Sequence, residues 1–250
     1  MRAMKSSNPM MTGKIYEKAG DVSAGAPVMT INGTINKIGL MLLLVIGAAA
    51  YTWKIVMGEN PGSAGTLAIV GAIGGFIMAM VTVFRPQSAA ITAPIYAILE
   101  GLFLGAISAI INAKYPGVAF QAVLLTIGTL FTMLFLYRSG YIRATPRFRR
   151  GVMMATGAVF FAYLMSWIMG MFGMSVGFMH SNGPLGILIN LVIIVIAALN
   201  LIMDFDFIEK GSQMGAPKYM EWYGAFGLMV TLIWLYIEFL RLLSRFAGRG

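Results

Sequence analysis

Three carboxylates lie within or at the end of long apolar runs of this sequence. Asp204 and Asp206 end a run that begins at Leu185, and Glu100 lies in the middle of another. A charge in such surroundings costs several kcal/mol unless it is paired, protonated or in contact with water. Because gaining or losing a proton would then rearrange the neighbouring side chains, these acids are candidates for a titratable gate.

Each of these carboxylates also has a purely structural interpretation. Asp204 and Asp206 could lie beyond the end of their helix, as charges already in water. If they instead belong to a cation pathway, their oxygens are possible Ca²⁺ ligands, because Ca²⁺ binds to oxygen atoms. Glu100 could form a hydrogen bond to a neighbouring helix. Glu100 is the hardest to explain without a function, because exposing it to lipid would cost roughly 2.5–3.5 kcal/mol.

Polar residues recur at helical spacing in the last two apolar runs of the chain. Asn200 and Asp204 are four residues apart, which places them on one face of a helix. Thr231, Glu238 and Arg241 belong to a polar row on the last run, and we predict an ion pair between Glu238 and Arg241 near the outer membrane surface. The alternative is that this pair is only structural and that the arginines reach toward lipid headgroups.

The composition identifies a polytopic membrane protein. The 250 residues are 59% hydrophobic and only 11% charged, whereas soluble domains carry about 25% charged residues. The basic residues behind the net charge of +9 lie between apolar runs, which indicates membrane orientation and not a nucleic-acid partner. With no cysteine, one histidine and no recognisable catalytic motif, we expect neither an enzyme nor a bound cofactor.

Seven apolar runs predict an all-α fold, a bundle of seven transmembrane helices. Each run has about the 20 residues that a helix needs to cross the hydrocarbon core. Residues 1–34 are expected to form a polar cytoplasmic tail, and residues 35–250 the membrane domain. The predicted spans are 38–57, 65–84, 91–111, 118–137, 151–172, 185–204 and 222–246.

The loop between the fourth and fifth spans is strongly basic. Its arginines are Arg138, Arg143, Arg147, Arg149 and Arg150. Together with the basic residues of the amino tail and of the loops that follow the second and sixth spans, they predict a cytoplasmic amino terminus. Membrane orientation is the simplest explanation of the loop, and a site for anionic lipid is the alternative. Two further motifs, Gly71-x-x-x-Gly75 and Gly101-x-x-x-Gly105, predict close helix contacts on the second and third spans.

Three of these segments together resemble the Bax inhibitor family, most closely its bacterial branch. They are Glu100-Gly101-Leu102-Phe103-Leu104-Gly105, Asp204-Phe205-Asp206-Phe207-Ile208 and Leu240-Arg241-Leu242-Leu243. The resemblance implies a seven-helix bundle with the last helix in the centre, located in the bacterial inner membrane. It also implies a pH-sensitive calcium leak, and in bacteria the modulation of a membrane-bound ATP-dependent protease.

The resemblance further implies a latch of two aspartates, on the sixth and seventh helices, with an arginine that ends the second. Asp204 matches the first aspartate and Arg85 the arginine, whereas Thr231 stands at the position of the second aspartate. Asp206 or Glu100 could substitute for the missing acid. Two hypotheses follow. The chain is either a cation leak gated by buried carboxylates, with Ca²⁺ as the permeant ion, or a non-transporting regulator that binds the protease.

Overall fold

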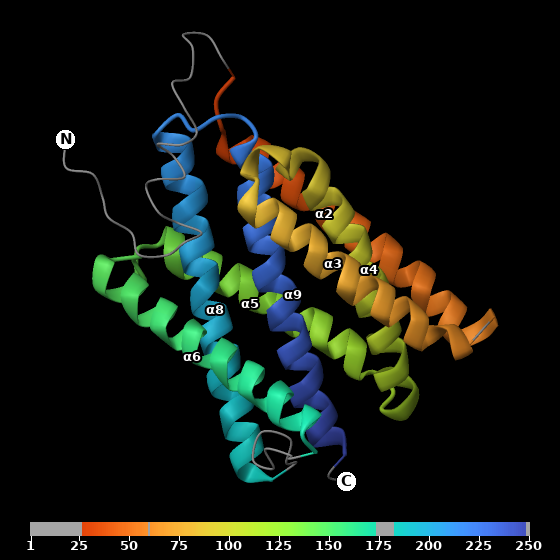
Figure 1. Cartoon of the computed structure of the whole chain (residues 1–250). Helices are drawn as coiled ribbons and strands as arrows, with labels where there is room; N and C mark the ends of the chain where they lie inside the picture. Colours follow the sequence, from red (N-terminus) through yellow and green to blue (C-terminus); the bar gives the residue numbers. More distant parts are fainter. Residues whose placement is uncertain (1–26, 60, 174–182, 249–250) are drawn as a thin grey trace. The chain divides into compact units, whose positions relative to one another are not determined.

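The computed structural model of this chain is all-α and describes residues 27–59, 61–173 and 183–248 (Figure 1). Within these ranges, seven long helices confirm the predicted fold class. They are α2 (Ile31–Lys54), α3 (Ala64–Phe84), α4 (Ala89–Lys114), α5 (Val118–Arg138), α6 (Pro146–Met171), α8 (Pro184–Gln213) and α9 (Met220–Ala247). Short turns of other helical types are η1 (Ile55–Glu59), η2 (Pro61–Ser63) and η3 (Pro86–Ser88). Most of the predicted tail lies outside the described residues.

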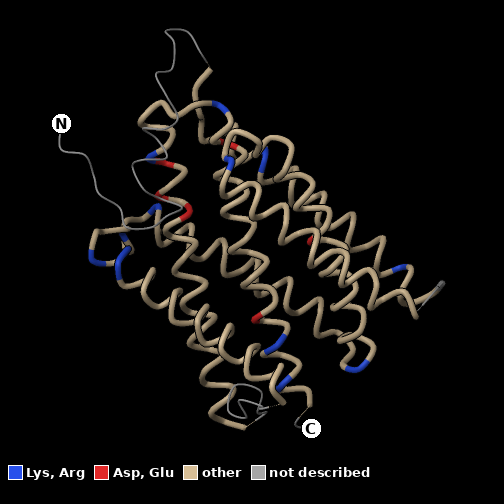
Figure 2. Tube along the Cα trace, viewed as in Figure 1, with Lys and Arg blue, Asp and Glu red and all other residues tan. Residues whose placement is uncertain are grey.

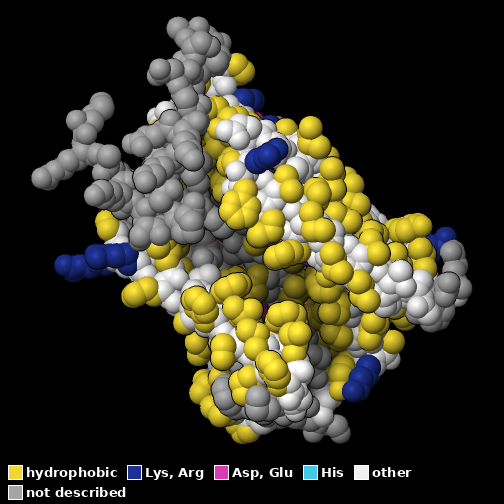
Figure 3. All heavy atoms as spheres, in the orientation of Figure 1, with side chains coloured by type: hydrophobic (Ala, Val, Ile, Leu, Met, Phe, Trp, Pro, Cys, Tyr) yellow, Lys and Arg dark blue, Asp and Glu magenta, His cyan; other side chains and the backbone are white. Residues whose placement is uncertain are grey.

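All seven helices are long and apolar enough to cross a bilayer. Large hydrophobic side chains face outward along them, among them Phe76 on α3, Phe131 on α5 and Trp167 on α6. Figure 3 shows hydrophobic side chains over much of the visible face. Such exposure would be unfavourable in water and is favourable in lipid, so these faces are suited to a bilayer.

The last helix, α9, is the most buried of the seven. In its apolar window 61% of the residues are buried, compared with at most 44% in the other helices. The side chains of α9 are therefore covered by the rest of the chain to a greater extent than those of the other helices.

Local sequence explains where several helices begin and end. Thr30 and Thr145 are N-caps whose hydroxyls accept hydrogen bonds from the N–H groups of Gly33 and Phe148, which begins α2 and α6. Arg85 ends α3 because it precedes Pro86, and a residue before proline is disfavoured in the helical region.

The two largest differences between the predicted spans and the observed helices concern the end of α8 and the beginning of α2. The helix α8 ends at Gln213 and not at residue 204, so Asp204 and Asp206 lie inside a helix. Similarly, α2 begins at Ile31 and not at residue 38, within the segment assigned to the tail. Both errors arise because a hydropathy profile locates the segment that enters lipid and not the ends of the helix. A helix extends beyond its apolar segment as long as its backbone hydrogen bonds and caps are satisfied.

The chain divides into two compact units, and each is described by itself. The first unit contains Met1–Ile110 and Asp204–Val230, and the second contains Ile111–Met203 and Thr231–Gly250. In the first unit, α2, α3 and α4 pack through glycines. A Cβ atom on Gly71 would lie 2.6 Å from the Leu99 carbonyl oxygen, and one on Gly101 would lie 2.6 Å from the Val45 carbonyl oxygen. The close contacts predicted from the glycine motifs are therefore confirmed.

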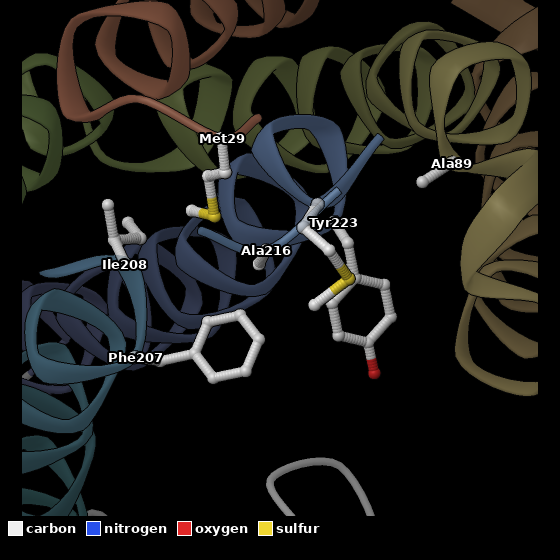
Figure 4. Packing of buried hydrophobic residues seen from close by; sticks show 7 residues of the cluster. Met29, Ala89, Phe207, Ile208, Ala216 and Tyr223 are labelled. Carbon is white, nitrogen blue, oxygen red and sulfur yellow. The ribbon is translucent and has the colours of Figure 1, made fainter. Parts of the chain in front are cut away.

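An N-terminal strap, residues 27–30, lies against the loop that joins α8 to α9. Val28 pairs with Pro217 in an isolated antiparallel bridge, and the Met29 N–H donates to the Ala216 carbonyl at 2.6 Å. The Met29 side chain is buried and packs with Phe207 and Ile208 of α8 and Tyr223 of α9 (Figure 4). The strap thus fixes the beginning of α2 to the segment that begins α9.

Candidate functional site

Glu100 lies inside α4 at a contact with α3. Its side chain is half-buried, and a Cβ atom on Gly75 would lie 2.7 Å from Glu100 Oε1. The carboxylate therefore fills space that the glycine leaves open. Among the described residues, no basic side chain forms an ion pair with Glu100. One turn earlier, the Tyr96 ring is buried and contacts Phe226 of α9 edge to face, with the ring centroids 5.0 Å apart.

Asp204 lies at the contact between α8 and the beginning of α9. It is half-buried, and a Cβ atom on Gly227 would lie 3.9 Å from Asp204 Oδ1. Glu100 and Asp204 thus share one arrangement, in which a carboxylate faces a glycine of the neighbouring helix. In both places the glycine has no side chain that would compete with the carboxylate for the space between the two helices.

Asp206 is buried and has a local ionic partner. Its Oδ1 lies 2.8 Å from Lys210 Nζ, one turn later on α8. This pair lies beyond residue 204, where we had placed the end of the helix. An acid and a base four residues apart stabilise a helix, so the pair helps to extend α8 to Gln213.

The structure does not bring Arg85 to Asp204. Arg85 is exposed at the end of α3, and within the described ranges no ion pair joins the two residues. The latch that the resemblance implies for these two residues therefore stays a prediction.

Asn200 and Thr231, the uncharged polar residues that the sequence analysis noted on the last two runs, have different surroundings. Asn200 links α8 to α6, because its side-chain amide donates to the Thr156 hydroxyl at 2.8 Å. The same amide donates within α8 to the Ile196 carbonyl at 2.8 Å. Thr231 is buried on α9. The hydrogen bond from Asn200 to Thr156 thus fixes α8 to α6 within the second unit.

In the second unit, Glu238 is the centre of a buried polar cluster. The predicted ion pair is present, with Arg241 Nη1 3.2 Å from Glu238 Oε2. Tyr163 of α6 donates to Glu238 Oε1 at 2.7 Å, and Asn190 of α8 donates to Oε2 at 2.8 Å. The carboxylate thus joins three helices, and sequence reasoning did not identify Tyr163 or Asn190.

A further carboxylate, Glu221 in the first turn of α9, was also missed. Its side chain is fully buried. Glu221 Oε2 pairs with Lys37 Nζ of α2 at 2.5 Å, and Oε1 pairs with Lys218 Nζ at 2.8 Å. Oε1 also accepts hydrogen bonds from the Thr30 N–H at 2.9 Å and the Thr30 hydroxyl at 2.8 Å. We call these four residues the Glu221 clamp. In the sequence, the one local indication of the clamp is the spacing of Lys218 and Glu221, three residues apart at the start of a helix.

Tyr219, next to the clamp, carries no charge at physiological pH. Tyr219 precedes α9 and packs against the buried cluster around Met29. Burial raises the pKa of the Tyr219 hydroxyl above its ordinary value of 10. The tyrosine therefore stays neutral at physiological pH and adds no charge beside Glu221.

The described residues offer no metal centre of three or more ligands. In these parts of the chain, no group of three histidine, aspartate or glutamate side chains lies close enough to hold an ion. Asp204 and Asp206 could offer Ca²⁺ only single carboxylates, which is compatible with passage of the ion and poorly suited to tight binding.

Comparison with known proteins gives a family but no individual relative. No curated protein matches the chain, and no solved structure matches it. The family described as Bax inhibitor 1 like matches residues 5–248. This match spans all seven helices and every carboxylate described above. The chain therefore belongs to the Bax inhibitor 1 like family and is an integral membrane protein.

Proposed function

We propose that this protein is a pH-sensitive cation leak, with Ca²⁺ as a permeant ion and with carboxylates at helix contacts as the gate. The observation that carries the proposal is the position of Asp204, which lies inside α8 and faces Gly227 of α9. Members of its family are in general non-enzymatic membrane proteins. Its setting in a bacterial inner membrane, with a cytoplasmic amino terminus, is part of the same proposal.

The charge of Asp204 is the proposed switch. In the ionised state, the carboxylate holds α8 and α9 together through interactions available only to the charged form. Protonation removes the charge, which weakens these interactions and lets the two helices separate. Acidification from pH 8 to pH 5 is therefore expected to increase the leak. Glu100 provides a second carboxylate at a glycine contact, in the middle of α4.

The test is calcium flux through the purified protein in liposomes that contain a calcium dye. Asp204→Asn imitates the protonated state, so its flux at pH 8 should equal that of the wild type at pH 5. Glu209→Gln is a matched control, because it removes one acid from the same helix at a side chain that Gln213 hydrogen-bonds. Identical flux at all pH values in the wild type and Asp204→Asn would refute the proposal.

Arg85 needs a separate variant. Although Arg85 is exposed and not paired with Asp204 here, a latch could form in a second conformation. If it does, Arg85→Gln should raise the flux at pH 8 as much as Asp204→Asn does. Unchanged flux in Arg85→Gln would remove Arg85 from the gate and leave the Asp204 proposal standing.

A second candidate function is the regulation of a membrane-bound ATP-dependent protease through the polar tail. The observation in its favour is the strap, which fixes the point where the tail joins the membrane domain. Deleting residues 2–26 leaves the strap and the Glu221 clamp intact. If the chain is a regulator, this deletion should abolish binding of the protease and leave any ion flux unchanged. Loss of flux with binding retained would argue against this function.

A further inference from the structure

The loop between α5 and α6 carries a concentrated positive charge at one end of two membrane spans. Its cations are Arg138, which ends α5, Arg143 in the loop, and three arginines in the first turns of α6, Arg147, Arg149 and Arg150. Figure 2 shows these basic residues gathered where α5 leads into α6. All except Arg149 are exposed, and in Figure 3 basic side chains at this end project outward.

The arginines are unfavourably placed for the helix that carries them. The N-terminus of a helix has a partial positive charge of about half a unit and favours anions. The first turn of α6 contains no acidic residue, and the sequence has no aspartate or glutamate between Glu100 and Asp204. The helices α5 and α6 and the loop between them therefore contain no acidic residue that could compensate the exposed arginines.

The loop has a defined conformation. Gly140 has φ = +75°, a conformation suited to glycine, and Ile142 N–H donates to the Leu136 carbonyl at 3.2 Å. Arg143 folds back over Gly140, so that a Cβ atom there would lie 3.4 Å from Arg143 Nη2. Arg150 Nε donates to the Pro146 carbonyl at 3.3 Å. The side chains of Arg143 and Arg150 are thus each held against the backbone of this loop or of the first turn of α6.

The position of the loop identifies the type of anion. Because α5 ends at Arg138 and α6 begins at Pro146, the short connection lies at the membrane surface, at the level of lipid headgroups. Tyr141 in this loop is 81% exposed, and tyrosines are enriched at that level. We propose that the α5–α6 loop, residues 138–150, binds the phosphate headgroup of an anionic phospholipid.

The test compares the binding of phosphatidylglycerol and phosphatidylcholine to the full chain by native mass spectrometry. Arg143→Gln with Arg147→Gln should lower the preference for phosphatidylglycerol by about fivefold for each arginine removed. Replacing both arginines by lysine keeps the charge and should retain most of the preference. Lys54→Gln with Lys114→Gln is the matched control, because it removes two exposed cations elsewhere and should change nothing.

The outcomes separate the possible sources of the anion. An unchanged preference in the double Gln variant would overturn the proposal, as would an equal loss in the Lys54 and Lys114 control. Full displacement of phosphatidylglycerol by inorganic phosphate would assign the loop to a free anion and overturn the lipid assignment. If the double variant unfolds, as judged by circular dichroism, Arg147→Gln alone serves, with an expected loss of about fivefold.

Discussion

Glu221 Oε1 accepts two hydrogen bonds from Thr30, a residue 191 positions earlier in the chain. The N-cap of α2 and the first turn of α9 are therefore one structural unit. Removing one member of a buried ion pair leaves the other charge uncompensated, which typically costs 3–5 kcal/mol. The clamp is consequently expected to stabilise the protein far more than a surface ion pair would.

We predict that Glu221→Ala lowers the free energy of unfolding by about 3–5 kcal/mol, because Lys37 would keep its charge without a partner. Lys218→Ala is the control, since its side chain is 46% exposed and such pairs contribute about 0–1 kcal/mol. Thermal and denaturant unfolding in detergent measure both. Equal losses of unfolding free energy in the two variants would show that the burial of Glu221 does not determine how much the clamp stabilises the protein.

The glycine contact between α2 and α4 provides a second prediction. Gly101→Ala should destabilise the protein by about 1–3 kcal/mol, since the added methyl group would collide with the Val45 carbonyl. Gly47→Ala on α2 meets no atom within 4 Å and should be neutral or stabilising by up to about 1 kcal/mol. The difference in unfolding temperature between the two variants is the measurement. A loss of the same size in both would contradict the close packing.

The Glu238 cluster predicts an effect for Tyr163→Phe. The tyrosine hydroxyl donates to the buried carboxylate and accepts from Arg241, and hydrogen bonds to charged groups contribute about 1.5–3 kcal/mol. We expect a loss of this size in unfolding free energy. Tyr141→Phe, at an exposed ring, should change it by less than about 0.5 kcal/mol. A loss below that value for Tyr163→Phe would mean that the hydroxyl is not needed.

On the proposed function, the residue at position 231 is expected to affect the pH range over which the leak changes. Thr231→Asp restores an acid at the position where the family's latch has its second aspartate. Two interacting carboxylates titrate as a coupled pair, so the flux of this variant should change with pH over a different and wider range than that of the wild type. Thr231→Val should leave the wild-type profile unchanged. The same profile in all three proteins would exclude Thr231 from the gate.

Sequence reasoning succeeded where the determining interactions are local. The start of α5 at Val118 follows from Tyr115-Pro116-Gly117, and the Glu238–Arg241 pair follows from a spacing of three on one helix. Helix contacts followed from glycine spacing, because only glycine permits such close approach of two backbones. The family resemblance supplied the remaining expectations about fold.

Interactions between distant residues were not predictable in this way. Nothing near Thr30 indicates that Glu221 will accept its hydrogen bonds, because the pairing depends on how α2 and α9 are packed. The end of α8 was missed because Asp206 and Lys210 lower the hydropathy of a segment that they also stabilise as a helix. Likewise, no pattern in the sequence shows that Tyr163 and Asn190 meet at Glu238.

The strap also has a consequence for biosynthesis. Thr30 leaves the ribosome 191 residues before Glu221 does, and at 5–20 residues per second this interval lasts roughly 10–40 s. During that time the first helix is in the membrane without the partner that completes its N-terminal end. The beginning of α2 therefore acquires its hydrogen bonds and its ion pair with Glu221 only after the first turn of α9 has been synthesised.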